Sequence, residues 1–212
     1  MKSTLYDRIR TLRVIPVVTL PKLDQAIPLA ESLIEAGLPC AEITFRTEAA
    51  ADAIHAIAKR HSKLLLGAGT VLSKNDADRA IDAGAQFIVS PGSNPHVIDH
   101  CISRNVPIFP GVATPTEVEL ALSHGIPVLK FFPAGAMGGV TMLKALAGPF
   151  PNVWFIPTGG IDEKNLGEYL AIPKVLACGG SWMVKPEWLN DGDFDRVREA
   201  AAQAVSLASK TA

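Results

Sequence analysis

Residues 14–44 read VIPVVTLPKLDQAIPLAESLIEAGLPCAEIT, and this stretch contains the pattern that decides the fold. A short apolar run at 14–18 is followed by an amphipathic segment at 22–36, and a second, mostly apolar run begins at Cys40. Both runs are too short for a helix and resemble strands that are covered on both faces. Gly37 follows the amphipathic segment, where a left-handed C-cap is common. The stretch therefore predicts a strand–helix–strand unit.

The same alternation continues to the end of the chain. The expected strands are 14–18, 40–45, 64–69, 86–90, 107–110, 128–132, 153–157 and 174–178. The expected helices are 22–36, 48–60, 74–83, 95–104, 115–123, 139–147, 162–170 and 193–208. Gly84 and Gly125 are expected C-caps, Thr114 and Asp162 are expected N-caps, and Pro115 suits a first helical position.

Strand–helix units that follow one another in this way predict parallel strands joined by crossover helices. There are eight such units, and eight parallel strands close into a barrel, so the sequence predicts a (β/α)8 TIM barrel. Residues 3–11 predict a short extra helix before the first strand, and no linker divides residues 1–212 into further domains. An open doubly wound sheet would give the same alternation and is the alternative fold.

The composition excludes several classes of partner. The 212 residues have a formal net charge of -1 and scattered Lys and Arg, which argues against binding to nucleic acid or an anionic membrane. No apolar run reaches the roughly 18 residues of a membrane span, and the first residues lack the apolar core of a secretory signal. Three widely spaced cysteines, Cys40, Cys101 and Cys178, fit a reducing compartment. We therefore expect a cytoplasmic protein.

Charged side chains interrupt the second expected strand, at Glu42 and Arg46. Side chains alternate faces along a strand, so Glu42, Thr44 and Arg46 share one face, while Ile43 and Phe45 share the other. Because the apolar pair suits the layer between sheet and helices, we expect the polar face to point into the barrel. An interior carboxylate needs a partner. A purely structural Glu42–Arg46 ion pair is the alternative interpretation.

Lys130 is the most anomalous residue of the chain, because it lies in the apolar run Val128–Leu129–Lys130–Phe131–Phe132. Desolvation and a nearby guanidinium such as Arg46 both favour the neutral amine, which is the form that attacks a carbonyl group. The alternatives are a lysine that reaches out of the barrel mouth, or one that only neutralises Glu42. A cavity that holds Glu, Arg and Lys together favours a catalytic site.

Glycines and hydroxyl groups follow several of the other strands. Thr70 ends the third expected strand, and Pro91 follows the fourth. Gly-Gly pairs follow the last two strands in Thr158–Gly160 and in Gly179–Ser181. In many barrels the loops after strands seven and eight hold a phosphate through backbone N–H groups, so these segments predict a phosphate site. Ordinary tight turns are the alternative.

A metal site is not expected. His96 and His100 have a spacing that could chelate zinc, but no acid or third histidine lies at a nearby strand end, and the middle of a helix is far from the barrel mouth. Surface histidines are the simpler interpretation. The cysteines have no neighbouring base, so a nucleophilic thiol is not expected either.

Six segments of this sequence, in order and with similar spacing, resemble one known family. They are Glu-Ile-Thr-Phe-Arg-Thr (42–47), Gly-Ala-Gly-Thr-Val (67–71), Ser-Pro-Gly (90–92), Lys-Phe-Phe-Pro-Ala (130–134), Pro-Thr-Gly-Gly-Ile (157–161) and Gly-Gly-Ser-Trp (179–182). The chain resembles the 2-keto-3-deoxy-6-phosphogluconate (KDPG) aldolases, also named for their second substrate, 4-hydroxy-2-oxoglutarate (KHG), from about residue 8 to residue 208.

The resemblance implies a class I aldolase that needs neither metal nor organic cofactor and forms a homotrimer. It implies that Lys130 forms the Schiff base and that Glu42 is the general acid/base. The residues implied to bind substrate are Arg46, Thr70, Pro91, Phe132, Thr158, Gly159, Gly160, Gly179, Gly180 and Ser181. Gly135 and Ser93–Asn94 depart from many relatives, which leaves substrate preference more open than the reaction.

The implied reaction is reversible cleavage of KDPG to pyruvate and glyceraldehyde 3-phosphate, and of KHG to pyruvate and glyoxylate. Three alternatives stay open at this point. The first is the corresponding aldolase for the galactonate-derived sugar phosphate. The second is a phosphosugar isomerase or epimerase on the same barrel, which would have no use for an imine-forming lysine. The third is a catalytically silent sugar-phosphate binding protein.

Overall fold

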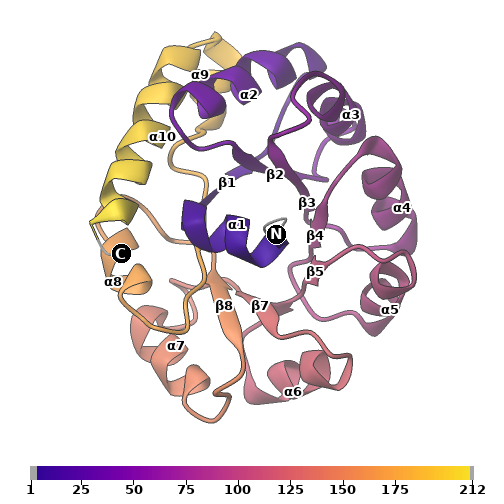
Figure 1. Ribbon diagram of the computed structural model, residues 1–212, viewed down its shortest axis with the longest axis vertical. Helices are drawn as coiled ribbons and strands as arrows, with labels where there is room; N and C mark the ends of the chain where they lie inside the picture. Colours follow the sequence, from indigo (N-terminus) through magenta and orange to yellow (C-terminus); the bar gives the residue numbers. More distant parts are fainter. Residues whose placement is uncertain (1–3, 211–212) are drawn as a thin grey trace.

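The computed structural model describes residues 4–210 and places parallel strands inside a ring of helices (Figure 1). The strands of the described chain are β1 (Val14–Val18), β2 (Cys40–Thr44), β3 (Leu65–Gly69), β4 (Phe87–Val89), β5 (Ile108–Phe109), β6 (Gly111–Val112), β7 (Val128–Phe131), β8 (Trp154–Pro157) and β9 (Cys178–Gly180). Each lies in or next to an expected run, and the pairings between them are parallel. The open doubly wound alternative does not fit this arrangement.

The strand ladder is less regular than a closed eight-stranded barrel. The described residues form a six-stranded sheet in the order β5-β4-β3-β2-β1-β9 and a three-stranded sheet in the order β6-β7-β8. The expected strand 107–110 is divided at Pro110, which has no backbone N–H to donate to a ladder. On the other side, β8 meets the β9 segment only through isolated bridges from Phe155 to Val175 and from Thr158 to Gly179. The fold is thus TIM-barrel-like, and its curled sheet is interrupted at two places.

Helices cover the outside of the strands. They are α1 (Leu5–Leu12), α2 (Ala26–Glu35), α3 (Ala50–Arg60), α4 (Lys74–Ala83), α5 (Pro95–Ser103), α6 (Pro115–Ser123), α7 (Gly139–Ala147), α8 (Leu166–Leu170), α9 (Pro186–Asp191) and α10 (Phe194–Ser209), with the 3-10 turn η1 (Leu23–Gln25) before α2. The expected helix 3–11 corresponds to α1, although residue 3 lies outside the described residues. The short helix α9 was not predicted.

The capping residues explain where several helices begin and end. Thr114 is the N-cap of α6 and forms a capping box with Glu117, as its hydroxyl suggests. Gly37, Gly84 and Gly125 have positive φ angles just after their helices, which glycine adopts without strain. The prediction for Asp162 was wrong. Its carboxylate accepts a hydrogen bond from the Lys164 N–H within a turn, so that α8 begins four residues later.

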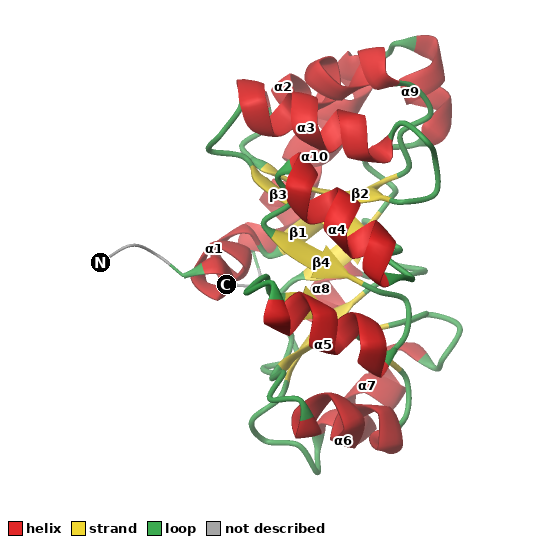
Figure 2. Ribbon diagram, turned by 90° about the vertical axis from the view of Figure 1, so that its right-hand side faces the viewer, coloured by secondary structure: helices red, strands yellow, loops and turns green. Residues whose placement is uncertain are grey.

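Helix α1 closes one end of the barrel. It crosses the centre of the ring in Figure 1 and lies at the end where the strands begin in Figure 2. Its buried residue Ile9 packs with an inward-facing apolar cluster that includes Ile15, Cys40, Phe87 and Phe109. The half of the barrel where the strands begin, next to α1, is therefore filled with apolar side chains.

A larger apolar cluster lies between the strands and the outer helices. It contains the strand residues Ile43, Ala68 and Phe131 together with residues from the surrounding helices, as far along the chain as Ala208. The interior toward the carboxyl ends of the strands is polar. Its buried polar residues come from the strands or follow them directly, and they are Glu42, Thr44, Lys130 and Thr158. The fold thus leaves its polar interior at the carboxyl ends of the strands.

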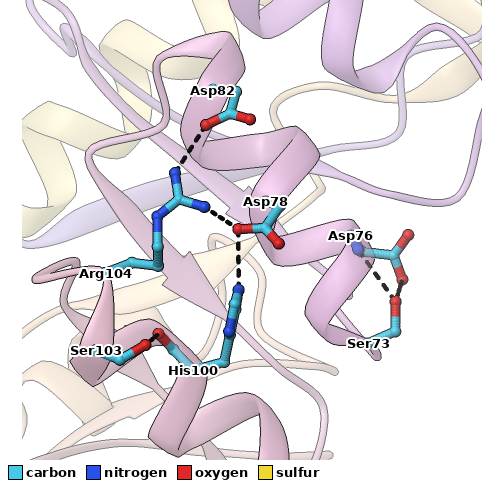
Figure 3. Close-up of polar contacts among 7 residues, drawn as sticks. All are labelled: Ser73, Asp76, Asp78, Asp82, His100, Ser103 and Arg104. Carbon is cyan, nitrogen blue, oxygen red and sulfur yellow. Dashed lines mark hydrogen bonds and ion pairs between the residues drawn. The ribbon is translucent and has the colours of Figure 1, made fainter.

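Ion pairs connect neighbouring helices on the surface (Figure 3). His100 of α5 donates from Nε2 to the Asp78 carboxylate of α4 at 2.9 Å, and Arg104 contacts both Asp78 and Asp82. His100 is therefore engaged with one carboxylate between two helices. Within residues 4–210 no cluster of three or more His, Cys, Asp or Glu side chains could hold a metal ion. No helix among these residues is long and apolar enough to cross a membrane.

Candidate active site

Lys130 and Glu42 face one another inside the barrel, in the half toward the carboxyl ends of the strands. The Lys130 Nζ atom lies 3.4 Å from Oε1 of Glu42, and the two side chains are only 7% and 4% exposed. They come from β7 and β2, which are not neighbours in either sheet, so the contact spans the interior. The amine also lies 5.0 Å from the centre of the Phe132 ring. The prediction that Glu42 and Lys130 share a cavity is confirmed.

The alternation of β2 explains how Glu42 reaches the interior. Cys40 belongs to the inner apolar cluster, whereas Ala41 and Ile43 belong to the outer one. Glu42 and Thr44 therefore point inward, and both are almost fully buried. The proposed Glu42–Arg46 ion pair is not the arrangement observed, because the carboxylate of Glu42 pairs with Lys130.

Arg46 and Thr70 lie together at the mouth of the pocket. The Nε atom of Arg46 donates to the Thr70 hydroxyl at 3.1 Å. Thr70 has a φ angle of +57°, a left-handed conformation that a β-branched residue rarely adopts. The chain accepts this strain and thereby directs the hydroxyl toward the guanidinium.

The loop after β8, together with the end of β9 and the residue that follows it, forms the opposite wall. Gly159 and Gly160 have φ angles of +92° and +75°, and a Cβ atom on Gly159 would lie 3.3 Å from the Phe132 ring. A Cβ atom on Gly179 would lie 2.4 Å from the Thr158 hydroxyl oxygen, and one on Gly180 would overlap the Trp182 ring. Glycine is therefore favoured at Gly159 and Gly160 by the backbone conformation, and at Gly179 and Gly180 by the close approach of neighbouring side chains.

These groups enclose a pocket of about 300 Å³. Its lining includes ten of the twelve predicted site residues: Glu42, Arg46, Thr70, Lys130, Phe132, Thr158, Gly159, Gly160, Gly180 and Ser181. The other two do not line it. Gly179 packs behind Thr158, and Pro91 lines a separate hollow with Leu72.

The pocket also contains residues that sequence reasoning missed. They are Val17, Thr19, Ile161, Val184 and Pro186. Thr19 had a recognisable signal, because it is a hydroxyl residue directly after the first strand, as Thr70 is after the third. Val184 precedes α9 and Pro186 is the first residue of that helix, for which the strand–helix pattern provided no signal.

The unusual residues of the mouth loops have structural contacts. Ser93 donates from its hydroxyl to the Gly111 carbonyl at 2.8 Å, and Asn94 caps α5 by accepting from the His96 N–H. The Gly135 N–H donates to the Gly159 carbonyl at 2.8 Å, which ties the loop after β7 to the loop after β8. Of Ser93, Asn94 and Gly135, it is Gly135 that forms a hydrogen bond with a loop lining the pocket.

The three cysteines are free and buried. Burial raises the pKa of the Cys40 and Cys178 thiols far above the usual range, and it raises the pKa of Cys101 to about 11. A thiolate is the nucleophilic form of cysteine, so these environments disfavour thiol chemistry. The amine that lines the pocket belongs to Lys130.

The family model for KDPG and KHG aldolase matches residues 5–200. The chain belongs to the KDPG and KHG aldolase family. A 2-dehydro-3-deoxy-phosphogluconate aldolase from Treponema pallidum is 52% identical over 204 residues, which cover 96% of this chain and 97% of the relative. A KHG/KDPG aldolase from Escherichia coli K12 is 43% identical over 96% of each chain.

A solved structure of a family member supports the same assignment. The KDPG aldolase of Legionella pneumophila is 38% identical and has a TM-score of 0.91, covering 97% of this chain and 99% of the other. That crystal structure contains pyruvate captured at low pH as a covalent carbinolamine intermediate. A carbinolamine is the adduct of an amine with a keto carbon, so this family member carries out amine–carbonyl chemistry.

Proposed function

We propose that this chain is a class I aldolase that reversibly cleaves KDPG to pyruvate and glyceraldehyde 3-phosphate, and KHG to pyruvate and glyoxylate. The observation that carries the proposal is the buried Lys130 amine, which faces Glu42 at 3.4 Å at the base of a pocket with Arg46 at its mouth. Family membership supplies the reaction class, and the site supplies residues suited to each step.

Lys130 is the proposed nucleophile. Its amine adds to the C2 keto carbon to give a carbinolamine, and loss of water gives a cationic imine. The C4 hydroxyl then loses its proton, the C3–C4 bond breaks, and the electron pair moves into the imine to form an enamine. Protonation of the enamine at C3 and hydrolysis of the imine release pyruvate and restore the amine.

Glu42 is the proposed proton-transfer group. It accepts the proton of the C4 hydroxyl, directly or through one water molecule, and returns a proton to the enamine. Its distance from the Lys130 amine supports this role, because the reacting carbons lie next to the imine nitrogen. Burial excludes bulk water from the enamine, which protects it while the aldehyde departs.

Arg46 and Thr70 are the proposed site for the substrate carboxylate. The guanidinium can form charge-assisted hydrogen bonds with a carboxylate and so fix the keto carbon next to Lys130. Phe132 and Pro91 are proposed to pack around the pyruvyl group. At the opposite wall, the phosphate is proposed to bind the N–H groups of Gly159, Gly160 and Gly180, together with the hydroxyls of Thr158 and Ser181 and with Gly179 behind them.

Borohydride reduction in the presence of pyruvate tests the proposal. The reduced adduct should appear on the peptide that contains Lys130 and should be absent in a Lys130→Met variant. Lys174, which lies on the opposite end of the barrel against Trp154, is a matched internal control and should stay unmodified. Absence of the Lys130 adduct would contradict the mechanism. A lactate-dehydrogenase-coupled assay with the gluconate, galactonate and hydroxy-oxoglutarate substrates then ranks them.

We also propose that residues 1–212 form one domain whose strands act as a single closed barrel. β5 and β6 continue one another across Pro110, and the bridge from Thr158 to Gly179 supports closure between β8 and β9.

The enzyme is proposed to act in the cytoplasm as a homotrimer. Free cysteines support the compartment, and the family resemblance supports the trimer. Light scattering after size-exclusion chromatography tests the trimer, and the mass of a monomer would contradict it.

A further inference from the structure

Thr19 lines the pocket but has no part in the chemistry proposed above. It directly follows β1, and its hydroxyl oxygen lies 3.0 Å from the hydroxyl oxygen of Thr44. Thr44 is 1% exposed on the inward face of β2, and within residues 4–210 Thr19 is the partner of its hydroxyl. A buried hydroxyl needs such a partner, so the pair fixes the Thr19 side chain at the pocket wall.

The position of Thr19 separates it from the two ends of the proposed substrate. β1 lies between β2 and β9, so Thr19 lies between the strand of Glu42 and the end of β9, where Gly180 and Ser181 lie. A substrate with its keto carbon at Lys130 and its phosphate at the glycine loops has its hydroxyl-bearing carbons between these points. Val17, the other lining residue from β1, offers no polar atom from its side chain.

We infer that Thr19 is a specificity-determining residue whose hydroxyl binds the C5 hydroxyl of the KDPG chain. This inference rests on the proposed function of the pocket. A threonine hydroxyl has one donor and two acceptor lone pairs, so it can bond Thr44 and a substrate hydroxyl at the same time. The C5 hydroxyl comes from glyceraldehyde 3-phosphate, and glyoxylate has no equivalent group. Thr19 therefore favours the sugar-phosphate substrate over the shorter one.

Aldol synthesis from pyruvate with either glyceraldehyde 3-phosphate or glyoxylate tests the inference. Thr19→Val keeps the side-chain shape but removes the hydroxyl. The kcat/KM for glyceraldehyde 3-phosphate, divided by the kcat/KM for glyoxylate, should therefore fall about tenfold. Thr19→Ser should restore the ratio. Thr116→Val, on the exposed surface of α6, is the matched control. An unchanged ratio in Thr19→Val would overturn the inference.

A second variant separates substrate binding from damage to the strand. Thr19→Val leaves the Thr44 hydroxyl buried without its partner, which disfavours the local structure. The double variant Thr19→Val/Thr44→Val removes both hydroxyls and should show the same loss of selectivity. Recovery of the wild-type ratio in the double variant would overturn the inference. Borohydride trapping of pyruvate on wild-type Lys130 checks the proposed function separately, because it does not depend on the aldehyde.

Discussion

Gly69 and Glu42 are fitted to one another on the inward faces of neighbouring strands. A methyl group on Gly69 would lie 2.1 Å from Oε1 of Glu42 and 2.7 Å from its Cγ and Cδ atoms. The register explains the contact, because Gly67 pairs with Glu42 and Gly69 pairs with Thr44, one inward position further along. The Glu42 side chain extends over that next position. Gly69 therefore provides the space in which the carboxylate meets Lys130.

Gly69→Ala should impair turnover more than it impairs folding. The added methyl group must displace the end of a flexible side chain, which the fold tolerates, but this moves the carboxylate away from the Lys130 amine. We expect kcat to fall about 100-fold, the size of effect seen when a general acid/base is lost. Adduct formation with pyruvate and borohydride should persist. Gly92→Ala is the control, because its Cβ atom would have no described atom within 4 Å. Wild-type turnover in Gly69→Ala would show that Glu42 needs no such space.

Lys130→Met should destabilise the protein as well as abolish catalysis. The substitution leaves Glu42 as an unpaired buried carboxylate, and breaking a buried pair from one side costs about 3–5 kcal/mol of the free energy of unfolding. Adding Glu42→Leu should recover much of that loss, because neither charge then remains in the interior. Urea denaturation measures both variants. Arg198→Met, which breaks exposed pairs with Glu35 and Asp195, should change stability by less than about 1 kcal/mol. Equal stability of the single and double variants would contradict the argument.

The sequence predicts the positions of Glu42 on β2 and Lys130 on β7 well, because one local rule is sufficient there. Alternation along a strand places Glu42 inward once Ile43 is assigned to the outer layer, and a lysine among apolar residues marks β7. The positions of Thr19 and Gly69 depend instead on register. Nothing local in the sequence states that Gly69 lies beside Thr44, or that the Thr19 hydroxyl meets one on β2.

The errors in the predicted elements have similar causes. Pro110 is an unremarkable end to a predicted strand, and only the pairing on both sides shows that it divides the strand. Asp162 has the chemistry of an N-cap, but its carboxylate bonds within a turn, so that α8 begins at Leu166. Local propensity correctly identifies Pro110 and Asp162 as residues near the boundary of an element. Tertiary contacts decide whether the helix or strand begins before or after them.

Thr70 should be a site where function opposes stability. Its φ angle of +57° is unfavourable for threonine and acceptable for asparagine. Thr70→Asn should therefore raise the free energy of unfolding by about 1 kcal/mol, while it increases KM for the keto acid by changing the partner of Arg46. Asn105 provides the reciprocal control, because it already has φ +55° at an exposed loop position. Asn105→Thr should lower stability by a similar amount without changing KM. Destabilisation by Thr70→Asn would contradict the proposed strain. Calorimetry and steady-state kinetics measure the two effects.

The Asp78–His100 contact should make stability depend on acid pH (Figure 3). The hydrogen bond from His100 lowers the pKa of the Asp78 carboxyl below its usual value of 3.8, and the positive charge of Arg104 contributes further. Because the pKa is lower in the folded than in the unfolded chain, the carboxylate stabilises the fold above about pH 4. This contribution is lost as the pH falls through the folded-state pKa. Asp78→Asn should therefore reduce the drop in unfolding free energy between neutral pH and pH 3, as measured by urea denaturation. Asp52→Asn, on the exposed face of α3, should reduce that drop less, and equal effects of the two substitutions would show that the contact with His100 does not matter.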